Sequence, residues 1–160
     1  MFRITLLTVG KLKEKFYLAA VEEYQKRLKS YCEFSLVELP ETRLPDDPSA
    51  AQIAAGLSKE AELIVQKLPK GAWFCVLTPE GTELSSERLA QKLEEVKLSG
   101  RGAACFLIGS SFGIAPEVKK QADFRLSFGP MTFPHHLMRV MALEQLYRAQ
   151  TILAGTKYHK

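Results

Sequence analysis

Short apolar runs alternate along the chain with longer stretches in which apolar residues recur every three or four positions. The short runs are rich in β-branched and aromatic residues, a composition that predicts strands. Five strands are predicted in this way, at Phe2–Val9, Glu33–Leu39, Ala72–Thr78, Ala103–Ile108 and Phe124–Phe128. Helical stretches separate the strands and one follows the last, which predicts βαβ units and a mainly parallel sheet. We therefore expect an α/β fold, with helices flanking the sheet, in one domain that spans residues 1–160.

Capping residues and helix-stopping residues set the expected bounds of the helices. The first helix follows the loop Gly10–Lys13 and extends to about Lys29. In the second helix, Asp47 is the expected cap and Pro48 the first helical residue. The others are expected after Ser85 or Ser86, at Pro116, and in a last helix with Pro134 in its first turn.

The predicted last helix carries two polar strips with an apolar face on either side. One strip holds Glu144, Arg148 and Thr151, and the other holds Arg139 and Gln150. A helix with two apolar faces is buried on two sides, and a domain of this size has little depth for that. We therefore predict a homodimer that packs through this helix.

Loops that contain glycine or proline follow the last three predicted strands, at residues 77–81, 109–113 and 129–135. Ligands of α/β sheets bind outside the carboxyl ends of the strands, so these loops form the candidate ligand site. They contain neither the dinucleotide-binding fingerprint nor the P-loop motif. For the loop Gly109–Gly113, a purely structural turn is the alternative.

Charge and cysteine content narrow the class of protein. The chain has 22 Lys and Arg against 18 Asp and Glu, and the resulting net charge of +4 is compatible with a polyanionic partner such as RNA. Cys32, Cys75 and Cys105 are odd in number and lack C-x-x-C spacing, so we expect buried free thiols and no metal site. The first residues do not resemble a signal peptide, and no apolar run has membrane-spanning length. These features predict a cytoplasmic protein.

Basic and aromatic side chains near the predicted loops are candidates for ligand contact. His135 and Arg139 are neighbours on one helix and suit a phosphate or an anionic base, although a capping histidine and a solvated arginine are the alternative. The tail Gly155–Lys160 combines a tyrosine, a histidine and two lysines, as an RNA-facing segment would, although a terminus of this kind is usually disordered. Three lysines at the start of the first helix suit phosphate contact or form a solvated cluster: Lys11, Lys13 and Lys15.

A further signal comes from seven segments: Val9–Lys13, Leu107–Gly109, Leu126–Ser127, Met131–His135, Arg139–Val140, Glu144–Ala149 and Tyr158–Lys160. Together they resemble the bacterial ribosomal RNA large-subunit methyltransferase H family, which belongs to the SPOUT (α/β-knot) class. The resemblance covers essentially the whole chain. It implies a C-terminal trefoil knot, an obligate homodimer and S-adenosylmethionine as cofactor. It also implies methylation of N3 of a pseudouridine in 23S rRNA on assembled ribosomes.

The resemblance also implies roles for individual residues. The implied cofactor-binding residues, many of them through backbone groups, are Leu77, Gly109, Phe128, Gly129, Pro130, Met131, Thr132 and Phe133. The family usually has a second glycine where this chain has Ser110. If the backbone there required a positive φ, serine would cost roughly 1 kcal/mol or more.

For catalysis, we expect Arg139 to stabilise the developing anion of the base, and His159 to contact or deprotonate it. His159 would come from the tail of either subunit. The expected substrate-binding residues are His135, Tyr158, Lys11 and Lys13. Two other classes of function stay open, namely a non-catalytic ribosome- or RNA-binding factor and a small-molecule enzyme that uses a nucleotide. Binding of S-adenosylmethionine rather than NAD or ATP would separate these classes.

Overall fold

All five predicted strands are present in the computed structural model, which describes residues 1–160. The strands are β1 (Arg3–Val9), β2 (Glu33–Leu39), β3 (Trp73–Glu83), β4 (Ala103–Ile108) and β5 (Phe124–Ser127). They form one parallel sheet in the order β2-β1-β4-β3-β5. The predicted α/β fold with a parallel sheet is therefore confirmed.

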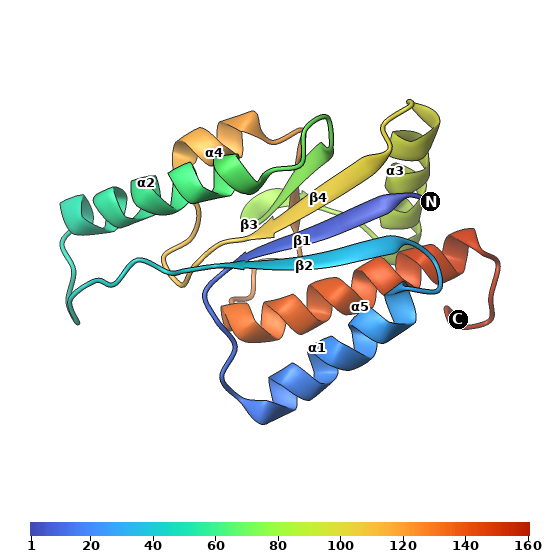
Figure 1. Cartoon of the computed structure of the whole chain (residues 1–160), viewed down its shortest axis with the longest axis horizontal. Helices are drawn as coiled ribbons and strands as arrows, with labels where there is room; N and C mark the ends of the chain where they lie inside the picture. The colour runs from blue at the N-terminus through green and yellow to red at the C-terminus, as the bar shows by residue number, and fades with distance from the viewer.

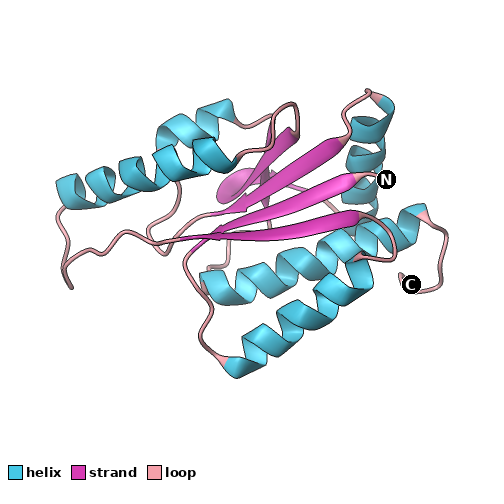
Figure 2. Cartoon of the chain, viewed as in Figure 1, coloured by secondary structure: helices cyan, strands magenta, loops and turns pink.

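Helices cover both faces of this sheet (Figure 1, Figure 2). One face carries α2 (Ala50–Lys67) and α4 (Pro116–Gln121). The other face carries α1 (Lys15–Leu28), α3 (Ser86–Leu98) and α5 (His135–Leu153). The sheet is thus the middle layer of three.

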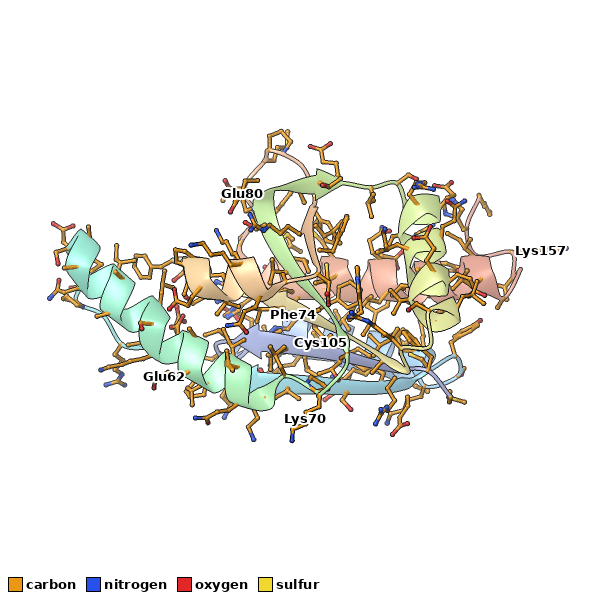
Figure 3. The ribbon with its side chains drawn as sticks, turned by 90° about the horizontal axis from the view of Figure 1, so that it is seen from above. Glu62, Lys70, Phe74, Glu80, Cys105 and Lys157 are labelled. Atoms are coloured by element: carbon orange, nitrogen blue, oxygen red, sulfur yellow. The ribbon has the colours of Figure 1, made fainter.

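Alternate side chains of each strand fill two cores, one on each face of the sheet. In β1, Ile4 and Leu6 join the core beneath α1, α3 and α5, whereas Leu7 joins the core beneath α2 and α4. The central strand β4 is buried along its whole length, which explains why its sequence is apolar without alternation. Phe74 and Cys105 lie in the second core, as Figure 3 shows from above.

The sequence predicts that the third strand ends at Thr78, and this prediction is wrong. Leu77 and Thr82 are both opposite Leu126 of β5, so the residues between them bulge out of the ladder and β3 then resumes. The segment Pro79–Gly81 has the turn chemistry that the sequence indicates, but it forms this bulge instead of ending the strand.

Two helices begin later than predicted. The N-cap of α2 is Ser49 rather than Asp47, because the Ser49 Oγ accepts a hydrogen bond from the Gln52 N–H while the Gln52 side chain accepts one from the Ser49 N–H. This capping box satisfies two backbone donors at once, which a single aspartate cap does not. Pro134 is the N-cap residue of α5, so that helix begins at His135.

Burial within one chain accounts for part of the two-sided pattern of α5. The helix packs against both α1 and α3, and Leu143 is fully buried. The strip that contains Arg139 and Gln150 is also buried, with exposed fractions of 1% and 3%. Val140 and Met141 stay half-buried on another side of the helix.

The three cysteines are buried free thiols, as predicted for Cys75 and Cys105. None of the helices combines the length and the apolar character that a membrane span needs. No three histidine, cysteine or acidic side chains lie close enough together to hold a metal ion.

Candidate active site

A cavity of about 230 Å³ opens where the bulge of β3 meets the carboxyl ends of β4 and β5. It brings together segments that are far apart in sequence, from the bulge of β3 to the start of α5. Seven of the eight predicted cofactor-binding residues line it: Leu77, Gly109, Phe128, Gly129, Met131, Thr132 and Phe133. Pro130 is not among the lining residues, although both of its chain neighbours are.

The loop Gly109–Gly113 is shaped by close packing. A Cβ at Gly109 would lie 2.4 Å from the Gly113 oxygen and 2.5 Å from a side-chain carbon of Ile114, so this position excludes any side chain. The Gly113 N–H donates a hydrogen bond to the Ser110 oxygen, and Gly113 has a φ of +97°. Ser110 has no positive φ, so the serine at the family's usual glycine position brings no backbone strain.

Ser127, at the end of β5, joins two of the loops that form the cavity. Its hydroxyl donates to the Pro79 oxygen at 2.9 Å and accepts a hydrogen bond from the Gly129 N–H at 3.1 Å. Gly129 has a φ of +109°, which favours glycine there. The bulge of β3 and the loop after β5 are therefore held together on one side of the cavity.

Glu80 and Lys119 form an ion pair at the cavity, with 2.5 Å between Glu80 Oε1 and Lys119 Nζ. The hydrogen bond from Lys119 lowers the pKa of Glu80 to about 2, so this carboxylate stays charged at neutral pH. Neither residue was predicted from the sequence. The turn-like segment around Glu80 gave a signal, but Lys119 lies on the short helix α4 and had none.

His135 lies at the start of α5 and lines the cavity. Its Nε2 atom is buried and has no hydrogen-bond partner. Partial burial lowers the pKa of His135, and the neighbouring His136 lowers it further. Burial thus favours the neutral imidazole, and its Nε2 atom is enclosed beside Gly10 instead of being exposed to the cavity.

Arg139 is one turn further along α5 but does not line the cavity. Its guanidinium pairs with Glu38 Oε2 at 2.6 Å and donates to the Gly10 oxygen at 3.0 Å. It thereby connects α5 to the carboxyl ends of β1 and β2. The sequence predicts that Arg139 contacts the target base. The guanidinium instead contacts Glu38 and Gly10, so this geometry does not favour direct contact with a base.

A second depression of about 510 Å³ adjoins the cavity, and His135 lines both. We call it the basic hollow, and it is lined by Gly10, Lys11, Lys13, residues 40–45, Phe112, His135 and His136. Lys11 and Lys13 lie in the loop that precedes α1 and are exposed. The predicted substrate-binding residues His135, Lys11 and Lys13 are thus brought together.

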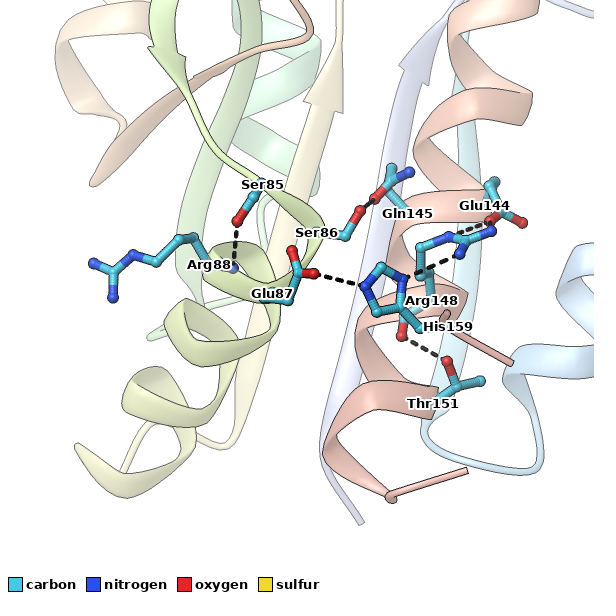
Figure 4. A network of polar contacts seen from close by, with 9 residues as sticks. All are labelled: Ser85, Ser86, Glu87, Arg88, Glu144, Gln145, Arg148, Thr151 and His159. Atoms are coloured by element: carbon cyan, nitrogen blue, oxygen red, sulfur yellow. Dashed lines mark hydrogen bonds and ion pairs between the residues drawn. The ribbon is translucent and has the colours of Figure 1, made fainter. Parts of the chain in front are cut away.

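The C-terminal tail folds back onto α3 and α5 of its own chain, as Figure 4 shows. The His159 ring lies between Glu87, 2.7 Å from Nε2, and Arg148, 3.2 Å from Nδ1. Since an arginine only donates, Nδ1 accepts and Nε2 carries the proton. The Tyr158 hydroxyl donates to Glu144 Oε2 at 2.8 Å. Both ring nitrogens of His159 are therefore occupied in this position.

The tail does not reach the cavity of its own chain. His135 lines the cavity at the start of α5, whereas Arg148 holds His159 near the other end of that helix. At about 1.5 Å of rise per residue, these two positions are roughly 20 Å apart along the helix axis. The structure therefore separates His159 and Tyr158 from the other predicted site residues.

Comparisons with known proteins identify the family and the fold. The family model described as a predicted SPOUT methyltransferase matches residues 2–159. A probable methyltransferase from Bordetella pertussis has a similar fold, with a TM-score of 0.54 at 14% identity over 93% of this chain and 96% of that chain. This likeness shows that the chain shares the fold of that structure.

Relatives of similar sequence show to which group within this family the chain belongs. Ribosomal RNA large subunit methyltransferase H of Moorella thermoacetica is 42% identical over the whole of both chains. The protein of that name from Acetivibrio thermocellus is 43% identical over 99% of each chain. The chain belongs to the SPOUT methyltransferase family, and within it to the group that contains these relatives. The resemblance inferred from the sequence is confirmed.

Proposed function

We propose that this protein transfers a methyl group from S-adenosylmethionine to N3 of a pseudouridine in 23S rRNA on assembled ribosomes. One observation carries the proposal: seven of the eight implied cofactor-binding residues converge on one cavity, between the bulge of β3 and the carboxyl ends of β4 and β5. The full-length relatives named ribosomal RNA large subunit methyltransferase H supply the class of substrate.

The residues of the cavity fit S-adenosylmethionine. Leu77, Ile108 and Phe128 offer apolar surface for an adenine ring, and the loop after β5 brings backbone groups to the same space. The Glu80–Lys119 pair presents one negative and one positive charge, which match the ammonium and carboxylate groups of a methionine moiety. When bound, S-adenosylmethionine supplies an electrophilic methyl group on a sulfonium.

The protein must then align the target base and accept its proton. The N3–C bond forms as the S–C bond breaks, and the N3 proton passes to a base on the protein or to solvent. His135 is suited to this contact, because partial burial favours its neutral ring and Nε2 has no hydrogen-bond partner. Since Nε2 is enclosed beside Gly10, the Gly10 loop must shift for the contact to form. We propose that Arg139 positions the Gly10 loop beside His135, since its two contacts are with Glu38 and Gly10.

We further propose that His159 and Tyr158 act at the cavity of a second copy of the chain. Within one chain they lie at the far end of α5, so a composite site requires a partner subunit. An open groove of about 600 Å³ suits that partner, because half-buried Val140 and Met141 line it together with Leu84 and Leu89. To act as a base, His159 must first leave Glu87 or Arg148, which occupy its nitrogens.

The trefoil knot is also a proposal. The bulge of β3 and the segments after β4 and β5 converge on one cavity, which supports the knot because a knot in this part of the chain would hold these segments together. A crystal structure traced from Met1 to Lys160 tests the knot, and a trace that straightens when both ends are pulled would exclude it.

The proposed substrate places the enzyme in the cytoplasm, and three buried free thiols suit a reducing compartment. Isothermal titration with S-adenosylmethionine, NAD and ATP tests the proposed cofactor. We expect saturable binding of S-adenosylmethionine alone. Ribosome binding without any S-adenosylmethionine binding would instead favour a non-catalytic ribosome-binding factor.

A further inference from the structure

Phe112 lies in the wall between the cavity and the basic hollow. Four residues of the loop Gly109–Gly113 line the cavity, whereas the fifth, Phe112, lines the hollow. The hydrogen bond from Gly113 to Ser110 closes a tight turn that places Phe112 at its tip. The Phe112 side chain is 44% exposed, so its ring is accessible at the surface of the hollow.

The cations of the hollow are free to bind an anion. Lys11, Lys13 and Arg43 are exposed, and none of them forms an ion pair. The carboxylate that lines the hollow belongs to Glu41, which accepts a hydrogen bond from the Ser111 hydroxyl at 3.0 Å. This bond also joins the loop after β2 to the loop that carries Phe112.

Proteins that bind single-stranded nucleic acid combine a positively charged groove with an aromatic side chain on which a base stacks. We infer that the basic hollow binds the RNA strand next to the target nucleotide. Phe112 stacks on a flanking base, and Arg43 binds phosphate together with Lys11 and Lys13. The strand then passes His135, which lines both spaces, so that the target base enters the cavity. This inference rests on the proposed function for the identity of the RNA.

Phe112→Leu, Phe112→Tyr and Arg43→Ala test the inference, with Lys70→Ala as the matched control. Lys70 is an exposed cation next to the amino end of β3 (Figure 3). The hollow is at the opposite end of the parallel sheet, where β1 and β2 end. The probe is ribosomes from cells that lack this protein, titrated with the labelled protein at several salt concentrations. Melting temperature and titration with S-adenosylmethionine confirm that each variant is folded and retains its cofactor site.

We expect Phe112→Leu to weaken ribosome binding by about tenfold, which is within the range for loss of a base–aromatic stack, and Phe112→Tyr to bind as the wild type does. Arg43→Ala should weaken binding and reduce the salt dependence by about one phosphate contact. Lys70→Ala should change neither quantity.

The inference is overturned if Phe112→Leu and Arg43→Ala bind ribosomes as tightly as Lys70→Ala does. It is also overturned if Phe112→Leu weakens the binding of S-adenosylmethionine as much as it weakens ribosome binding. If ribosome binding is unchanged in both variants but the wild type transfers methyl groups, the proposed function holds although the hollow does not bind RNA. Conversely, weaker binding of the two variants in a protein that transfers no methyl group would support an RNA site in the hollow and contradict the proposed function.

Discussion

Gly109 is the residue whose replacement has the clearest physical consequence. An added Cβ would lie 2.4 Å from the Gly113 oxygen, so Gly109→Ala must displace the loop that lines the cavity. We expect the free energy of unfolding to fall by about 1–3 kcal/mol, as in other overpacked sites, and binding of S-adenosylmethionine to weaken. Gly102→Ala is the control, because a Cβ there meets nothing within 4 Å. Urea unfolding and isothermal titration measure the two effects, and equal values for both variants would contradict the packing argument.

Arg139 tests the difference between positioning a loop and contacting a base. Its side chain is 1% exposed and that of its partner Glu38 is 39% exposed. We expect Arg139→Ala to lower the free energy of unfolding by about 2–3 kcal/mol, somewhat less than for a fully buried pair. Arg27→Ala, which removes the exposed pair with Glu23, should change it by less than about 1 kcal/mol.

Single-turnover methyl transfer decides the role of Arg139. A positioning role predicts a lower transfer rate together with the lower stability, and partial recovery in Arg139→Lys, which keeps the charge. If Arg139→Ala and His159→Ala both retained the wild-type rate at saturating ribosome concentration, neither residue would contribute to catalysis.

At the scale of elements, the tail depends on Glu144 of α5. Partial burial raises the pKa of Glu144. Hydrogen bonds from Tyr24, Tyr158 and Arg148 lower this pKa by a larger amount, so the net shift is downward from 4.5. A lowered carboxylate pKa adds stability above the unfolded-state value, and this contribution is lost as the pH falls through the folded-state value. The tail should therefore stay docked at neutral pH and loosen progressively as the pH falls from 4.5 through the lower folded-state pKa of Glu144.

Glu144→Gln isolates this effect, because glutamine keeps the shape of the side chain without the charge. We expect the variant to lose about 1 kcal/mol of stability at pH 7 and to show faster hydrogen exchange in the tail. The difference between the variant and the wild type should narrow as the pH falls below 4.5. A difference that stayed constant from pH 7 to pH 3 would show that the charge of Glu144 does not hold the tail.

The elements also show what the sequence could predict. Strand positions followed from apolar runs, because burial on both faces leaves a strong local signal. The bulge of β3 did not, since it depends on pairing with β5. In the candidate site, the glycine-containing loops were predicted as ligand loops because they follow the predicted strands. The Glu80–Lys119 pair, Ser127 and the contacts of Arg139 were missed because each joins residues that only the tertiary fold brings together.

At the scale of the whole molecule, the proposed catalytic residues divide between two ends of α5. A composite site therefore requires a dimer, and light scattering at micromolar concentration should give twice the chain mass of 17.9 kDa. Met141→Glu places a charge in the open groove and should yield monomers without methyl transfer. Leu98→Glu, at a residue that is already 80% exposed, should leave the dimer intact. A monomeric wild-type protein that is fully active would contradict the composite site.

The most direct measurement is transfer of labelled methyl from S-adenosylmethionine to assembled ribosomes taken from cells that lack this protein. Ribosomes from cells that contain the protein are the matched control, because their target is already methylated. We predict label in the first sample alone, at N3 of a 23S rRNA pseudouridine. The absence of transfer despite tight ribosome binding would contradict the proposed function and indicate a binding factor.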